Sequence, residues 1–141
     1  MSDKTHSPKP GGQPAIRVIA MPADTNPNGD IFGGWVMSHM DLAGATVAIL
    51  EAKGRVATVA VDGMSFHKPV FVGDIVSFYS QVARIGRTSI TVKVEAWALR
   101  HRLGEEERVT EGTFTYVAIG EDRPRAPWRR PRRFRYDGAS A

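Results

Sequence analysis

The sequence predicts an α+β fold in which an antiparallel β-sheet wraps around one long central helix. Two observations lead to this prediction. The segment from about residue 33 to residue 53 is apolar on nearly every face of a helix, which is typical of a helix enclosed by other structure. The chain after it reads as strands rich in Val and Thr, separated by polar turns. The 141 residues suit one domain, and a hydrophobic content of 42% is enough for a core.

The expected elements follow in the order β-α-β-β-β-β. A first short strand is expected over residues 15–21, where AIRVIAM alternates. A run of turn formers then ends at Asp30, a good N-cap residue for the helix, and Gly54 is expected to stop it. Four longer strands are expected over residues 55–66, 75–85, 88–99 and 109–119. A curved sheet would cover most of the helix and a second copy of the chain the rest, which describes the hotdog fold and predicts a dimer.

Composition divides the chain into three parts: a disordered segment over residues 1–14, the folded domain over 15–120 and an Arg-rich tail over 121–141. The tail contains seven arginines and three acidic residues, a surplus that equals the net charge of the whole chain, +4. The high isoelectric point therefore belongs to the tail and not to the folded body.

Several classes of protein are excluded or disfavoured. The absence of cysteine excludes disulfides, thiolate metal sites and a cysteine nucleophile. The four histidines lack ligand spacing, so no metal is expected, and no Walker A or dinucleotide-binding glycine motif occurs. The longest apolar stretch, residues 43–50, is shorter than the roughly 20 residues that span a membrane, and no signal peptide is visible. A cytoplasmic protein without membrane association is expected.

Asp41 stands in the middle of the apolar helix. An ionised carboxylate there is costly without a partner, so Asp41 either faces solvent or a base such as Lys53, or acts as a general base or nucleophile. Gly33 and Gly34 lie at the expected helix N-terminus, where free N–H groups stabilise an oxyanion, although a plain loop-to-helix join is the commoner case. From Gly34 to Asp41 the helix rises about 10 Å. If both groups act on one carbon, they come from different chains.

A resemblance to the YciA-like acyl-CoA thioesterases rests on three motifs: MPADTNPNGDIFGGWVMSHMDLAGA (21–45), FHKPVFVGD (66–74) and GRTS (86–89). The similarity spans about residues 15–120 and implies a hotdog enzyme that hydrolyses acyl-CoA in a divided active site. It implies that Asp41 is the catalytic aspartate, that Asn26 comes from the opposite subunit, and that the amides near Gly33 and Gly34 contact the oxyanion. Taken alone, Asn26 suits a turn in which its side chain bonds its own backbone.

The resemblance also implies where coenzyme A lies: along the edge formed by Gly86, Arg87, Thr88 and Ser89, with Lys68 as a further candidate cation for the phosphates. The residues alone fit an ordinary hairpin with solvated charges equally well. Acyl-CoA is then the substrate, and no separate cofactor is expected. The resemblance further implies a homo-oligomer, a dimer at least and a trimer of dimers.

Two other functions compete with hydrolysis. One is a non-catalytic module that binds acyl-CoA or, through the Arg-rich tail, nucleic acid, although no DNA-binding helix pair is visible. The other is a hotdog dehydratase or hydratase, for which no histidine is suitably placed. The tail itself is most simply a solvated extension, and its alternative targets are nucleic acid, the phosphates of coenzyme A or an acidic patch on a neighbouring subunit.

Overall fold

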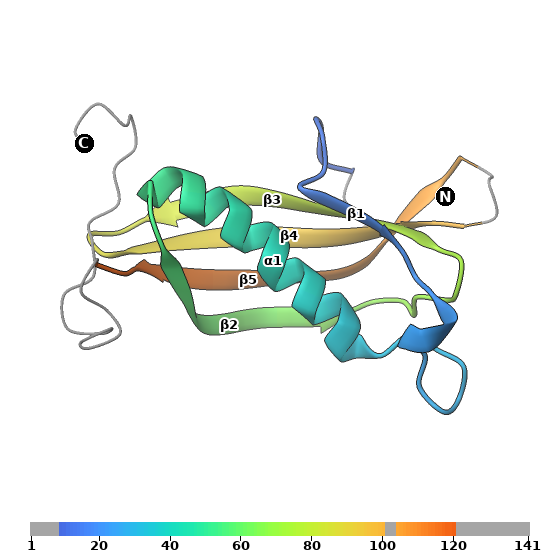
Figure 1. Ribbon diagram of the computed structural model, residues 1–141. Helices are drawn as coiled ribbons and strands as arrows, with labels where there is room; N and C mark the ends of the chain where they lie inside the picture. The colour runs from blue at the N-terminus through green and yellow to red at the C-terminus, as the bar shows by residue number, and fades with distance from the viewer. Residues whose placement is uncertain (1–8, 101–103, 121–141) are drawn as a thin grey trace.

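The computed structural model describes residues 9–100 and 104–120, which form one five-stranded antiparallel sheet with one long helix across one face (Figure 1). The elements are β1 (Ile16–Ile19), η1 (Pro22–Asp24), α1 (Gly33–Ala52), β2 (Val56–Phe66), β3 (Ile75–Ile85), β4 (Ser89–Leu99) and β5 (Glu106–Ala118). The strand order in the sheet is β1-β3-β4-β5-β2. This architecture confirms the predicted α+β hotdog fold and its order of elements.

Of the two predicted helix boundary signals, the one at the N-terminus is wrong and the one at the C-terminus is confirmed. The N-cap of α1 is Phe32, without a side-chain cap, and not Asp30. Asp30 instead forms a bridge with Phe71, and the Ile31 N–H donates to the Val70 carbonyl at 3.0 Å, so the chain stays extended for two more residues. At the other end the helix stops before Gly54, as expected: Ala52 is its last residue, and the cap residue Lys53 takes the left-handed conformation with φ of 55° and donates its N–H to the Ile49 carbonyl.

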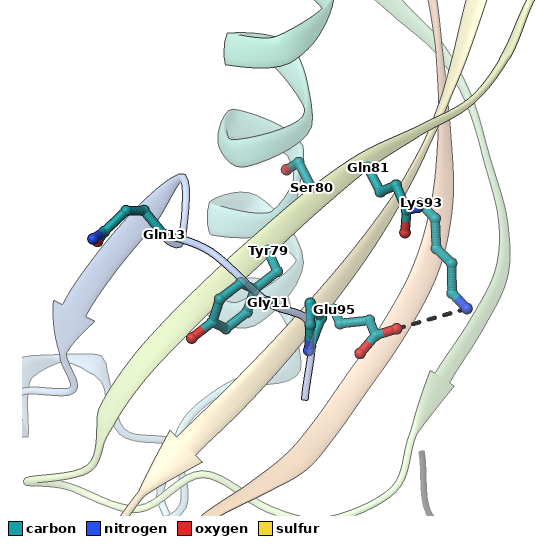
Figure 2. A pocket seen from close by; sticks show the side chains of 8 residues that line it. Gly11, Gln13, Tyr79, Ser80, Gln81, Lys93 and Glu95 are labelled. Atoms are coloured by element: carbon teal, nitrogen blue, oxygen red, sulfur yellow. Dashed lines mark ion pairs between the residues drawn. The ribbon is translucent and has the colours of Figure 1, made fainter. Parts of the chain in front are cut away.

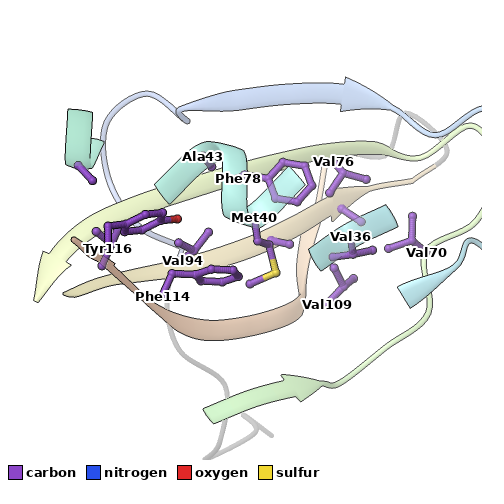
Figure 3. Close-up of a cluster of buried hydrophobic side chains, with 14 of the residues drawn as sticks. Val36, Met40, Ala43, Val70, Val76, Phe78, Val94, Val109, Phe114 and Tyr116 are labelled. Atoms are coloured by element: carbon purple, nitrogen blue, oxygen red, sulfur yellow. The ribbon is translucent and has the colours of Figure 1, made fainter. Parts of the chain in front are cut away.

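The core lies between α1 and the face of the sheet that it crosses (Figure 3). Its members alternate along the strands, as the period of two requires, and include Val76, Phe78, Val94, Phe114 and Tyr116 from the sheet and Val36, Met40 and Ala43 from the helix. Burial of these side chains in contact with one another is the main source of stability for such a layer.

One chain covers only one face of α1. Four apolar side chains on or next to the helix remain exposed: Phe32 at 51%, Leu42 at 55%, Ile49 at 45% and Leu50 at 73%. The edge strand β2 adds exposed Val59 and Val61. Exposed large apolar side chains along one helix and an edge strand are typical of an interaction site, which agrees with the expectation that a second copy covers the rest of the helix.

The opposite face of the sheet carries polar side chains and the start of the described chain. Residues 10–13 of the expected disordered segment lie beside this face, and the Lys9 Nζ is 2.7 Å from the Glu106 Oε1. The expected Arg-rich tail lies outside the described residues. Within the described ranges, no helix combines the length and apolarity that crossing a membrane requires.

Candidate active site

Asp41 lies in the middle of α1, partly exposed, and faces the edge of the sheet formed by β2 and β5. Its Oδ1 accepts hydrogen bonds from the Thr58 hydroxyl at 2.8 Å and from the Tyr116 hydroxyl at 3.1 Å. Thr58 and Tyr116 are partners in the β2–β5 register, so two neighbouring strands present both donors at one point. No described base forms an ion pair with Asp41, so the pairing with Lys53 that the sequence left open does not occur.

Tyr116 holds Asp41 through two contacts. Its fully buried hydroxyl also lies 2.8 Å from the main-chain carbonyl oxygen of Asp41. Burial raises the pKa of Tyr116 far above its ordinary value of 10.0, and the nearby Asp41 carboxylate raises it further. Gly44, one turn along the helix, makes room for this hydroxyl, because a Cβ there would overlap it. The hydroxyl therefore remains a proton donor to Asp41.

The two oxygens of the Asp41 carboxylate are unequal. Oδ1 accepts both hydroxyl contacts, whereas Oδ2 accepts no hydrogen bond from the residues that the structure describes. A carboxylate oxygen that is not engaged by donors keeps its lone pairs for another group. Oδ2 is therefore the oxygen available for chemistry.

Sequence reasoning missed both partners of Asp41. Tyr116 carried a usable signal, since it shares the inward face of β5 with Phe114, and a buried tyrosine hydroxyl needs a hydrogen-bond partner. Thr58 gave no comparable signal, because threonine is common in strands.

The Asn26 side chain bonds its own loop, which is the local arrangement that the residue taken alone suggested. Its Oδ1 accepts from the Asn28 N–H at 2.9 Å and the Asp30 N–H at 3.1 Å. Because both partners are donors, the accepting atom must be the amide oxygen. The Asn26 NH2 group is thereby turned away from these amides and makes no hydrogen bond to a described residue, so it can donate elsewhere.

Gly33 and Gly34 form the first turn of α1, as expected, and both are exposed. N–H groups in a first helical turn have no carbonyl partner within the helix. Beside Gly34 nothing lies within 4 Å of an added Cβ, whereas a Cβ at Gly33 would lie 3.3 Å from the Phe66 ring. The open space at Gly34 lets another molecule approach the backbone closely.

Asp41 and the helix N-terminus lie at different places along the same chain. From Gly33 to Asp41 the helix rises about 12 Å. The ring of Phe66 lies beside Gly33, and Phe66 pairs with Thr110 of β5. Thr110 is six residues from Tyr116, or about 20 Å along the strand. One chain therefore does not bring the Asp41 carboxylate to the amides of Gly33 and Gly34.

The four residues expected at the coenzyme A edge form the β3–β4 hairpin. The Gly86 N–H donates to the Ser89 carbonyl at 2.7 Å, and the Thr88 carbonyl accepts from the Ala118 N–H at 3.3 Å. Ser89 pairs with Val117, the neighbour of Tyr116, so the hairpin lies close to Asp41.

Lys68 does not join this hairpin within one chain. Its N–H is 3.2 Å from the Val109 carbonyl, at the far end of β5, and its Nζ lies 2.7 Å from the Glu107 Oε1. The expected coenzyme A residues are thus divided between the two ends of the sheet, and Lys68 shares its end with Gly33 and Phe66.

A groove of about 350 Å³ opens on the face of the sheet opposite α1 (Figure 2). It is lined by Gln13, Tyr79, Gln81, Lys93 and Glu95 among others, and it contains none of the expected site residues. Glu95 accepts from the Trp97 indole N–H at 2.9 Å and lies 3.6 Å from the Lys93 Nζ. Its charge is thus already compensated within the sheet.

Histidine and metal chemistry are not indicated at Asp41. The Nδ1 of His39 lies 2.9 Å from the Trp35 carbonyl oxygen, and its ring stacks on Phe78. In residues 9–100 and 104–120, no cluster of three or more His, Asp or Glu side chains is arranged to hold a metal ion.

This chain is similar in sequence to a known protein family and to its individual members. Residues 28–105 match the family model described as the thioesterase superfamily. The acyl-CoA thioester hydrolase YciA of Escherichia coli K12 is 48% identical over 121 residues, which are 83% of this chain and 92% of that protein.

Two solved structures are similar over most of their length. The hexameric thioesterase y2039 of Yersinia pestis is 47% identical with a TM-score of 0.78, over 90% of this chain and 98% of that one. HI0827, a hexameric broad-specificity acyl-coenzyme A thioesterase solved as a variant with alanine in place of an aspartate, is 44% identical. Its TM-score is 0.79, over 90% of this chain and 88% of that one.

Proposed function

This chain belongs to the YciA-like acyl-CoA thioesterases of the thioesterase superfamily, and we propose that it hydrolyses acyl-CoA to a carboxylic acid and free coenzyme A with Asp41 at the reacting centre. The observation that carries the proposal is the held carboxylate: Thr58 and Tyr116 both donate to Oδ1, and Oδ2 stays available. A carboxylate fixed in one orientation is ready to act without rearrangement.

Asp41 acts in one of two ways. As a general base, its Oδ2 takes a proton from water while the water oxygen bonds to the thioester carbonyl carbon. The C–S bond then breaks, and the coenzyme A sulfur leaves with that proton. As a nucleophile, Oδ2 itself bonds to the carbonyl carbon and expels the thiolate, which takes up a proton, and water then cleaves the anhydride. Label found on Asp41 after a single turnover in ¹⁸O-labelled water would establish the nucleophilic route, because water that attacks the Asp41 carbonyl carbon of the anhydride leaves its oxygen there, whereas the general-base route leaves none.

A second copy of the chain supplies the rest of the site. Within one chain, Asp41 is about 12 Å from Gly33 along the helix. The exposed apolar residues of α1 and edge strand β2 offer a surface for dimerisation. The partner then contributes the free amides at Gly33 and Gly34, which stabilise the oxyanion, and the Asn26 NH2 group, which positions water or the thioester carbonyl.

The same division extends to coenzyme A. The hairpin residues Gly86, Arg87, Thr88 and Ser89 lie next to Asp41 and follow the pantetheine and phosphates of the substrate. Lys68 lies at the end of the partner that carries Gly33 and therefore joins the site only from the second copy. The hexameric relatives support a trimer of such dimers.

The test is a free-thiol release assay with short, medium and long acyl-CoAs. Asp41→Ala and Asn26→Ala are compared with the wild type, and circular dichroism controls for folding. Turnover by Asp41→Ala is expected to fall at least about 100-fold, as for loss of a general base. Wild-type rates in Asp41→Ala would remove Asp41 from the mechanism. Binding of acyl-CoA without any turnover by the wild type would favour a non-catalytic module.

A further inference from the structure

Arg100, the residue after β4, holds the connection between β2 and β3, residues 67–74, by three contacts. Its Nε donates to the Asp74 Oδ2 at 3.0 Å, and its Nη2 donates to the Pro69 carbonyl at 2.6 Å. The guanidinium also lies over the Phe71 ring, 5.0 Å from its centroid. One side chain therefore binds the connection near its start, in its middle and at its end.

The contacts of Arg100 are largely shielded from solvent. The Arg100 side chain is 17% exposed and that of Asp74 is 5% exposed. The same Asp74 oxygen accepts from the Phe71 N–H at 2.9 Å, and the Glu107 Oε2 on β5 accepts from the Arg100 Nη1 at 2.7 Å. A planar guanidinium satisfies several acceptors in fixed directions, which the point charge of a lysine ammonium does less well. Arg100 thus ties the connection to the sheet.

The same connection pairs with the chain that leads into α1 (Figure 1). Asp30 forms a bridge with Phe71, and the Ile31 N–H donates to the Val70 carbonyl at 3.0 Å. Asp30 also makes two contacts with Asn26: its N–H donates to the Asn26 Oδ1 at 3.1 Å, and its carbonyl accepts from the Asn26 N–H at 2.6 Å. The orientation of the Asn26 side chain therefore depends on where the connection lies.

The first turn of α1 depends on the same support. Phe66, the residue before the connection, has its ring 3.3 Å from the place that a Cβ on Gly33 would occupy. Ile31, which is buried and bonded to the connection, stands two residues before Gly33. A shift of the connection therefore moves the N–H groups at Gly33 and Gly34 as well as Asn26. Displacement of reacting groups by about 1 Å can slow a reaction by up to about 100-fold.

We propose that Arg100 is a positioning residue for the half of the divided site that carries Asn26, Gly33 and Gly34, and that it acts on this half through residues 67–74. The inference rests on the proposed function, because that function assigns these three residues a part in the reaction. Arg100 itself touches neither the substrate nor the reacting atoms.

The other half of the site lies too far away for Arg100 to affect it directly. Leu99, the neighbour of Arg100, pairs with Glu106 at the start of β5, whereas Asp41 is held by Tyr116. Glu106 and Tyr116 are ten residues apart, or about 33 Å along the strand. Loss of Arg100 should therefore disturb the Asn26 half of its own chain and leave the Asp41 half intact.

The first test measures kcat of the full-length protein with saturating acyl-CoA. Arg100→Gln is expected to lower kcat about tenfold, and Arg100→Lys, which keeps a cation beside Asp74, about threefold. Lys9→Gln is the matched control, because it removes a cation that lies 2.7 Å from Glu106 at the same end of the sheet and leaves residues 67–74 untouched. Its kcat should equal that of the wild type. Wild-type kcat in Arg100→Gln would overturn the proposal.

Co-refolding of two variants shows which half of the site Arg100 serves. Arg100→Gln chains mixed with Asp41→Ala chains should restore about a quarter of wild-type turnover, because half of the randomly paired dimers are mixed and each has one intact site. Mixed with Asn26→Ala chains, they should restore nothing beyond their own residual activity. No recovery with Asp41→Ala would mean damage to the whole fold, and recovery with Asn26→Ala would place the effect at Asp41. Either result overturns the proposal.

Amide hydrogen exchange tests the same support without turnover, so it decides on Arg100 even if no thioester is hydrolysed and the proposed function fails. It uses Arg100→Lys, which serves also if Arg100→Gln does not fold. The exchange rate of the Ile31 N–H should rise about tenfold, because the Val70 carbonyl that accepts it moves with the connection. The Ala118 N–H, which donates to the Thr88 carbonyl at the hairpin end, should exchange as in the wild type. An unchanged rate at Ile31, or an equal rise at Ala118, would overturn the proposal.

Discussion

The hydroxyl of Tyr116 lies 2.8 Å from the main-chain carbonyl oxygen of Asp41 and 3.1 Å from Oδ1 of the same residue. One strand side chain thus holds both the backbone and the carboxylate of a residue in the middle of the helix. The contact fixes the carboxylate relative to the sheet, and the sheet also carries the hairpin expected to bind coenzyme A.

Replacement of Tyr116 by Phe removes this hydroxyl while keeping the buried ring. The Oδ1 of Asp41 then keeps only the Thr58 contact, and the carboxylate samples other orientations. We expect kcat to fall about tenfold with little change in KM, because substrate binding does not involve Tyr116. Thr58→Val is the matched variant on the neighbouring strand. An unchanged kcat in Tyr116→Phe, with normal folding, would show that Tyr116 does not position Asp41.

Gly44→Ala tests the space around the same hydroxyl. An added Cβ would overlap the Tyr116 hydroxyl and lie 3.1 Å from the ring carbon that bears it, so the helix or the ring must shift. The expected loss is about 1–3 kcal/mol in the free energy of unfolding, typical of overpacking, together with reduced kcat. Alanine is otherwise the better helix former, so a stabilised Gly44→Ala protein would contradict the contact.

Alkaline pH tests the burial of Tyr116. The pKa of the folded-state hydroxyl is raised above its ordinary value of 10.0, so the folded chain keeps a proton that the unfolded chain loses. This stabilisation is complete below about pH 10 and is lost as the pH rises further, by at most about 1.4 kcal/mol per pH unit. Urea unfolding at pH 8, 10 and 11 should show a steeper loss in the wild type than in Tyr116→Phe. Equal losses would mean that the Tyr116 hydroxyl ionises in the folded chain as readily as in the unfolded one.

Mixing two inactive variants tests the divided site. In a mixed dimer of Asp41→Ala and Asn26→Ala chains, one of the two sites receives an intact Asp41 from one chain and an intact Asn26 from the other. Random pairing after co-refolding should restore about a quarter of wild-type turnover.

The control mixture pairs Asp41→Ala with Asp41→Asn, which leaves every site without the carboxylate and should stay inactive. Native mass spectrometry shows whether mixed dimers have formed. Their presence without any recovered activity would place Asp41 and Asn26 in the same chain's site.

Local patterns in the sequence predicted most of the fold. Alternation with a period of two located strands β3 and β4 to within a residue, and the all-round apolar segment located α1. The predicted N-cap was wrong because the bridge between Asp30 and Phe71 links segments far apart in the chain, and this link keeps the residues before the helix extended. The placement of Asp41 within the helix followed from the sequence, since the helix boundaries alone determine it.

The elements, their order and the isolated carboxylate of Asp41 could be predicted from local patterns, because propensity and periodicity act between neighbours along the chain. The groups that hold this carboxylate could not be predicted in that way, since Thr58 and Tyr116 lie 17 and 75 residues away from Asp41 and meet it only in the folded chain. The positions of Lys68 and the hairpin at opposite ends of one sheet likewise depend on the tertiary structure. The register of strand pairing sets such distances, and register depends on the packing of the whole sheet against the helix.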